Sequence, residues 1–212
     1  MNIDEITYEY YSHWTGVIIT PQTRGVFFSH DPKKDTVPKG YSRTTDVYVF
    51  VNDNIRVVSY GTRAKERIEK IADKLQGNKC IDSLRFLLQE TFLTDVGENI
   101  KYIYRTRAEN PAPAVVLNAA HYDLFFEFFK ENNLDVKDYS WLKEYFLGMA
   151  AKRYCHGIII GNKLVSATDA PDMPYMQDLV QEIGINTLKE YRGKGYARAA
   201  CVSLINDLLS RG

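Results

Sequence analysis

The stretch EYRGKGYARAACVSLI, residues 190–205, carries the strongest chemical signal in the sequence. Gly193 and Gly195 alternate with the cations Arg192 and Lys194, and an apolar helical pattern follows. The first N–H groups of a helix have no intrahelical partner, and with the helix dipole they attract anions. A glycine lets an anion approach the backbone closely because it has no Cβ. The stretch therefore predicts a local anion site, although a tight strand-to-helix turn with solvent-facing cations would also explain it.

Two well-known phosphate loops do not fit these residues. The GxxxxGK[ST] loop needs its lysine after the last glycine and then Ser or Thr, whereas Lys194 precedes Gly195. The GxGxxG fingerprint begins at Gly193 and Gly195 but meets Arg198 where helix and strand should pack closely. The remaining pattern is R-x-x-G-x-A, formed by Arg192, Gly195 and Ala197.

The composition of the chain limits the partners and the compartment that can be expected for this site. The chain of 212 residues has 27 Lys plus Arg and 27 Asp plus Glu, so its formal net charge is zero. That balance argues against nucleic acid or an anionic membrane as the main partner. The sequence has no secretory pattern and no apolar run of membrane-spanning length, so we expect a cytoplasmic protein. The three cysteines lack CxxC spacing and the four histidines do not cluster, which predicts no metal site.

The first half predicts an N-terminal α/β region. Residues 46–60 have the pattern of a β-hairpin turning at Asn52–Asn54, and residues 62–77 have helical periodicity ending at Gly77. A second helix is expected from Asp82 or Ser83 onwards, and a strand at residues 101–107. The prolines of ENPAP, residues 109–113, predict a boundary between a domain of residues 1–109 and a domain of residues 110–212.

The second half predicts two helices, three strands and a last helix. The helices are expected at 121–133 and 138–153, a hairpin at 155–160 and 163–170, a strand at 180–188 and the last helix at 197–212. These elements indicate an α+β fold with a mixed, mainly antiparallel sheet flanked by helices. Cys155 and His156 could be read as a nucleophile and base, but adjacent strand residues point to opposite faces, so packing is the favoured interpretation.

Arg192, Gly195 and Ala197, after the passage QEIGINTLKEY, resemble the signature of the GNAT superfamily of N-acetyltransferases. The order of elements in the second half is also similar to that family's order. The resemblance implies an acyl-CoA N-acyltransferase-like fold and acetyl-CoA as cosubstrate, with no metal. It implies that the strand edge at Ile185, Asn186 and Thr187 pairs with pantetheine. The pyrophosphate would be held by residues of the glycine turn: Arg192, Gly193, Lys194, Gly195, Tyr196 and Ala197.

The resemblance further implies direct transfer of an acetyl group to a primary amine of a small molecule or peptide. Glu182 is our candidate for the base, and an apolar neighbour would raise its pKa. Met173, Tyr175 and Met176 lie in the loop that faces the acceptor in this fold class. They could line a substrate pocket or cap the core.

One departure leaves a second function open. Family members continue beyond this helix into further strands and a helix, so we expect the GNAT-like core to be C-terminally incomplete here. A second chain, for instance in a homodimer, could then complete the sheet. The alternative to an enzyme is a non-catalytic acyl-CoA-binding or interaction module.

Overall fold

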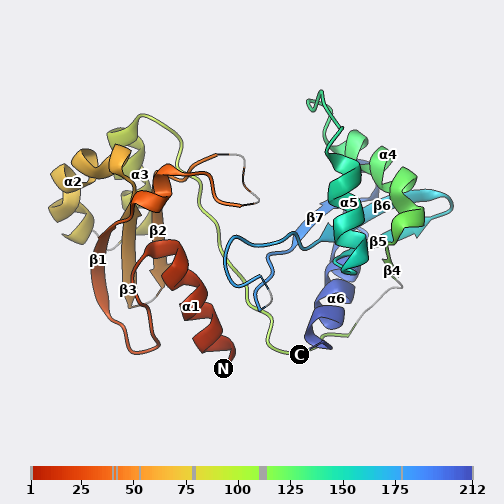
Figure 1. Cartoon of the computed structure of the whole chain (residues 1–212), viewed down its shortest axis with the longest axis horizontal. Helices are drawn as coiled ribbons and strands as arrows, with labels where there is room; N and C mark the ends of the chain where they lie inside the picture. The colour runs from red at the N-terminus through yellow and green to blue at the C-terminus, as the bar shows by residue number, and fades with distance from the viewer. Residues whose placement is uncertain are drawn as a thin grey trace. The chain divides into compact units, whose positions relative to one another are not determined.

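The computed structural model describes residues 2–39, 41, 43–52, 54–77, 80–109, 114–177 and 179–211, which form two compact units (Figure 1). Unit 1 contains Met1–Tyr102 together with Met173–Val180. Unit 2 contains Ile103–Asp172 and Gln181–Gly212. The boundary predicted at ENPAP lies outside the described residues except for Glu109.

Unit 1 is a three-stranded sheet with three helices. Its β-hairpin and its second and third helices are confirmed, whereas its first helix and first strand were not predicted. The sheet order is β1-β3-β2, with β1 parallel and β2 antiparallel to β3. The elements are α1 (Ile3–Thr15), β1 (Gly25–His30), η1 (Pro32–Asp35), β2 (Val47–Asn52), β3 (Ile55–Tyr60), η2 (Thr62–Ala64), α2 (Lys65–Gly77) and α3 (Ile81–Phe92).

The strand predicted at residues 101–107 is wrong. This stretch has no regular secondary structure, and Tyr102, Ile103 and Tyr104 are exposed. Aromatic and β-branched residues favour a strand only where another strand offers hydrogen bonds and a face to pack on.

Unit 2 contains a four-stranded antiparallel sheet in the order β4-β5-β6-β7. The predicted fold class, α+β with mainly antiparallel strands flanked by helices, is therefore confirmed. The elements are β4 (Val115–Val116), η3 (Ala119–His121), α4 (Tyr122–Asn132), α5 (Leu142–Ala151), β5 (Cys155–Ile160), β6 (Lys163–Asp169), β7 (Gly184–Thr187), η4 (Lys189–Tyr191) and α6 (Tyr196–Leu209).

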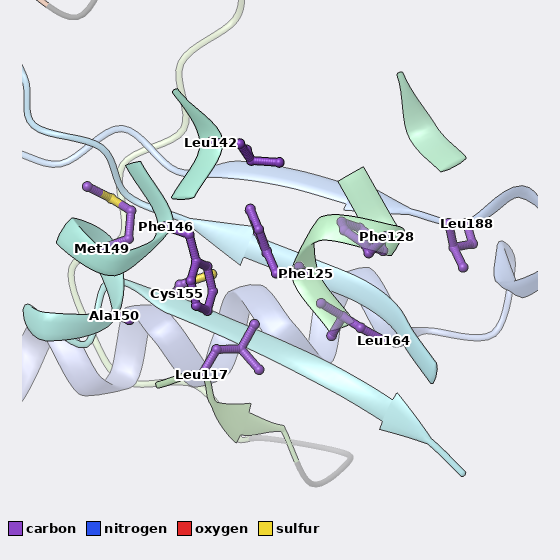
Figure 2. Packing of buried hydrophobic residues seen from close by; sticks show 11 residues of the cluster. Leu117, Phe125, Phe128, Leu142, Phe146, Met149, Ala150, Cys155, Leu164 and Leu188 are labelled. Carbon is purple, nitrogen blue, oxygen red and sulfur yellow. The ribbon is translucent and has the colours of Figure 1, made fainter. Parts of the chain in front are cut away.

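Helices cover both faces of this sheet. Phe125 of α4 and Phe146 of α5 stack with ring centroids 4.6 Å apart, in a core cluster that also contains Leu164 of β6 (Figure 2). On the opposite face, Val165 of β6 packs against Ala200 of α6. Neighbouring residues of β6 thus serve two different cores, as the two-residue repeat of a strand requires.

Two predicted elements are much shorter in the structure than in the sequence analysis. The helix expected at 138–153 begins at Leu142, because Asp138 accepts a hydrogen bond from the Ser140 N–H at 2.9 Å and holds a turn. The strand expected at 180–188 is limited to Gly184–Thr187. No helix of the described segments is long and apolar enough to cross a membrane.

His156 joins β5 to α6 through a buried polar network. Its Nδ1 lies 2.9 Å from the Ser203 Oγ, and its Nε2 lies 3.5 Å from the Asp207 carboxylate, which also pairs with Arg153. Cys155 packs on the other face of the sheet, so the expected separation of these neighbours is confirmed. Burial lowers the pKa of His156 below 6.5, and Asp207 opposes this effect only in part.

The pKa of His156 is lower in the folded chain than in the unfolded chain. As the pH falls below about 6.5, the unfolded chain therefore binds a proton at His156 before the folded chain does. We therefore expect the free energy of unfolding of unit 2 to decrease on acidification through this range. Urea unfolding followed by ¹⁹F NMR of fluorotryptophan would measure it, since Trp141 reports on unit 2 and Trp14 on unit 1.

The matched variants are His156→Gln and His13→Gln, which remove one histidine each. His156→Gln should weaken the pH dependence of the Trp141 transition, whereas the exposed His13 should leave it unchanged. An equal pH dependence in wild type and His156→Gln would contradict the prediction.

Candidate functional site

The glycine turn lies between the end of β7 and the start of α6. Sequence reasoning expected the strand to enter the turn directly, whereas the structure inserts the short helix Lys189–Tyr191 first. Gly193 and Gly195 have φ values of +76° and +79°, the left-handed region that other residues adopt only with strain. The turn therefore needs glycine at both positions for backbone reasons alone.

Gly195 is the N-cap of α6, and it provides no side chain to cap the helix. The first hydrogen bond of α6 is donated by the Ala199 N–H to the Gly195 carbonyl at 3.0 Å. The N–H groups of the preceding residues keep their hydrogen-bonding capacity, as at the start of any uncapped helix. A Cβ built on Gly193 or Gly195 meets no described atom within 4 Å, so the space beside this backbone is open.

Cations surround the turn although the whole chain has no net charge. The Arg192 Nε donates a hydrogen bond to the Thr187 carbonyl at 3.0 Å, which ties the turn to the end of β7. The Lys194 Nζ lies 5.0 Å from the centroid of the Tyr191 ring. Lys163 approaches the same ring at 6.0 Å and pairs with Glu131. The turn thus carries the charges of Arg192 and Lys194, with the acidic Glu190 just before it.

Strand β7 pairs only with β6 among the described strands, so one edge of it is unpaired. The carbonyls of Gly184 and Asn186 point toward β6, since they accept hydrogen bonds from the Thr168 and Ser166 hydroxyls at 2.7 and 3.1 Å. Strand residues alternate in this respect, so the main-chain groups of Ile185 and Thr187 point away from β6. Because Arg192 occupies the Thr187 carbonyl, the outer edge offers the Ile185 N–H and carbonyl and the Thr187 N–H.

The predicted cofactor residues are therefore brought together at one end of α6 and along one strand edge. Gly184, Ile185 and Asn186 are exposed, whereas Thr187 is buried with its hydroxyl 2.8 Å from that of Ser166. Tyr196 and Ala197 are half-buried in the first turn of α6, where Tyr196 packs against the cluster that contains Val165.

Glu182, the predicted base, lies two residues before β7 and is half-buried. It is near the end of β7 that is farther from the glycine turn. Its catalytic role stays a prediction.

The predicted substrate-binding loop contributes to unit 1. Met173 is 4% exposed in a core with Trp14 and Val57, and Met176 packs at its margin. The Tyr175 ring stacks on His13 with centroids 5.4 Å apart. These contacts correspond to the interpretation in which the loop caps the core. Its substrate-binding role stays a prediction.

Sequence reasoning missed one polar cluster on the α4 and α5 face of the sheet. The Tyr145 hydroxyl donates a hydrogen bond to the Asp169 carboxylate at 2.6 Å, next to buried Cys155. The sequence contained a signal for this cluster, because Asp169 is two residues after Ala167 and therefore lies on the same, core-facing side of β6. None of the described residues forms a group of three or more His, Cys, Asp or Glu that could hold a metal ion.

No protein-family model matches the sequence, and a search of curated proteins finds no match. A GNAT-family acetyltransferase from Colwellia psychrerythraea is 14% identical with a TM-score of 0.42, over 80% of this chain and 69% of that one. A ribosomal-protein-alanine N-acetyltransferase from Brucella melitensis is 18% identical with a TM-score of 0.36, over 47% and 73%. A GCN5-related N-acetyltransferase from Kribbella flavida is 14% identical with a TM-score of 0.37, over 47% and 28%. Similarity at this level assigns neither an activity nor a substrate to this chain.

The Arg192 hydrogen bond predicts how the glycine turn is kept ordered. Arg192→Met keeps the aliphatic stem but removes the donor to the Thr187 carbonyl, which costs about 0.5–1.5 kcal/mol. We expect the ¹⁵N order parameters of Gly193 and Gly195 to fall to about 0.6 or below.

Lys194→Met is the matched control, because among the described residues the contact of Lys194 is with the Tyr191 ring. It should leave the order parameters of both glycines unchanged. Equal values in wild type and Arg192→Met would show that Arg192 does not hold the turn.

Proposed function

We propose that this chain binds acetyl-CoA along β7 and the glycine turn and transfers its acetyl group to a primary amine. The single observation that supports this most strongly is the left-handed Gly195 N-cap of α6, which leaves uncapped N–H groups. The short helix Lys189–Tyr191 separates them from the edge of β7 that no described strand pairs with. At Gly195 the residue type, the left-handed backbone and the open space beside it all suit the binding of an anion.

The diphosphate of the cosubstrate would lie over the glycine turn. Its negative charge would face the N–H groups that precede Ala199 and the positive end of the α6 dipole. Lys194 and Arg192 add charge nearby without any side chain entering the open space beside the glycines. The residues present therefore fit a phosphate group.

The pantetheine arm would continue along the outer edge of β7. Its amides can pair with the Ile185 N–H and carbonyl and the Thr187 N–H as an added strand does. This pairing would also cover a strand edge that is otherwise open to association with other chains.

The chemistry needs an activated acyl group, a neutral amine and a stabilised oxyanion. Bound acetyl-CoA would supply the thioester, and a strand N–H would serve as oxyanion donor. Glu182, beyond the far end of β7, is the base predicted from the sequence.

Calorimetric titration with acetyl-CoA tests the site, with Gly195→Ala and Gly161→Ala as a matched pair. Both glycines have positive φ, +79° and +60°, and neither has a described atom within 4 Å of a built Cβ. Both variants therefore bear a similar backbone strain of about 1–2 kcal/mol. We expect wild type and Gly161→Ala to bind alike, and Gly195→Ala to bind at least about tenfold more weakly.

Absence of wild-type binding, or equal affinity of both variants, would refute the proposed site. Spermidine and a peptide with a free α-amino group are suitable acceptor probes, followed by release of the CoA thiol. Binding without transfer to either amine would favour the non-catalytic acyl-CoA-binding module.

A further inference from the structure

Asp169 lies at the point where three strands of unit 2 come side by side. It is the last residue of β6, and its register partners are Cys155 on β5 and Gly184 on β7. Its side chain is on the face covered by α4 and α5, where the Tyr145 hydroxyl donates to its Oδ2 at 2.6 Å. One carboxylate oxygen is therefore fixed by α5.

The other oxygen lies over β7. A Cβ built on Gly184 would lie closer to the Asp169 Oδ1 than any real contact allows. The missing side chain at residue 184 thus makes room for the carboxylate of Asp169, a residue that is half-buried. Gly184 itself is exposed at the start of the strand that the cosubstrate would follow.

The surroundings of the carboxyl group favour a proton-accepting role. Burial raises the pKa of Asp169 above its ordinary value, and the hydrogen bond from Tyr145 offsets this only in part. Burial and the neighbouring carboxylate raise the pKa of Tyr145, so the hydroxyl remains a donor. Burial and the same carboxylate also raise the pKa of the Cys155 thiol, which stays neutral. From β7 the facing residue is Gly184, which has no ionisable side chain.

The position along β7 matches the expected position of the thioester. Thr187 and Gly184 are three residues apart, or about 10 Å at about 3.3 Å per strand residue. An arm that starts at the glycine turn and pairs with Ile185 would place its reactive end at Gly184 or just beyond. This step depends on the function proposed above.

We propose that Asp169 is the catalytic residue that takes the proton from the acceptor's ammonium group. The proton passes from R–NH₃⁺ to the Asp169 carboxylate, which leaves R–NH₂ with a lone pair. The amine nitrogen then forms a bond to the acetyl carbonyl carbon, the C–S bond breaks, and the CoA thiolate leaves with the second amine proton. Asp169 finally releases its proton to water.

Asp169 and Glu182 lie toward the same end of β7, so the roles of the two carboxylates need to be distinguished. Three amide substitutions separate the roles: Asp169→Asn, Glu182→Gln and Asp172→Asn. The amide oxygen introduced by Asp169→Asn can still accept the hydrogen bond from Tyr145, so the fold of this variant should persist. Asp172 is the matched control, because its carboxylate pairs with Lys152 and lies outside β6 and β7.

Transfer to spermidine and to the free-amine peptide would be measured beside acetyl-CoA affinity and the unfolding temperature. In Asp169→Asn we expect transfer to fall by about 10²-fold or more, with acetyl-CoA affinity within about twofold of wild type. Asp172→Asn should match wild type. Transfer near the wild-type rate in Asp169→Asn, with a strong loss in Glu182→Gln, would overturn this inference and leave the proposed function intact.

A wild-type chain that binds no acetyl-CoA, or acetylates neither amine, would remove the proposed function and this inference together. A readout that needs no turnover is ¹³C NMR of the aspartate carboxyl groups, in which the Asp169 signal is the one lost in Asp169→Asn. Its midpoint should lie above the ordinary value of about 3.9. A midpoint at or below that value would overturn the assignment.

Tyr145→Phe gives a further test with a definite sign. The Tyr145 hydrogen bond stabilises the charged carboxylate, so its removal should raise the Asp169 midpoint. The acidic limb of the pH–rate profile should move in the same direction. A limb that stays in place while the ¹³C midpoint moves would show that Asp169 does not accept the proton.

Discussion

The pairing of β7 with β6 is the constraint on which the site in unit 2 depends. The two strands share only four residue pairs, from Ser166 with Thr187 to Asp169 with Gly184. Side-chain hydroxyls strengthen this short ladder, because Thr168 and Ser166 donate to the carbonyls of Gly184 and Asn186. These bonds fix which main-chain groups of β7 face outward. A shift of the β6–β7 register by one residue would turn each of these main-chain groups to the opposite side.

The same pairing fixes the glycine turn at one end of β7 and Asp169 at the other. The Arg192 side chain donates a hydrogen bond from the turn to the Thr187 carbonyl, so β7 fixes the position of the turn. Gly184 makes room for the Asp169 carboxylate at the opposite end. The strand between the two ends sets their spacing. A short rigid element thus relates the proposed anion-binding turn to the proposed proton acceptor.

Periodicity predicted most of the elements, and tertiary packing decided the rest. The hairpins and α4 follow from local patterns, and the capping box of Asn2 and Glu5 was a missed local signal for α1. The stretch 101–107 failed because the strand pattern found no partner. The loop at 173–180 could not be placed from its own residues, since the aromatic core of unit 1 that receives it is formed by distant segments.

In the candidate site too, local patterns predict one part and tertiary packing decides the other. The left-handed glycines could be predicted because the requirement is local to residues 193–195, whereas Asp169 needed the register that brings it over Gly184. A partly buried carboxylate beside a buried thiol opposes the stability of this face, and an apolar residue would pack there at lower cost. Local rules that a stable fold would otherwise keep are most often broken at functional positions. The Tyr145 hydrogen bond offsets the cost only in part, which leaves Asp169 readier to accept a proton than an ordinary carboxylate.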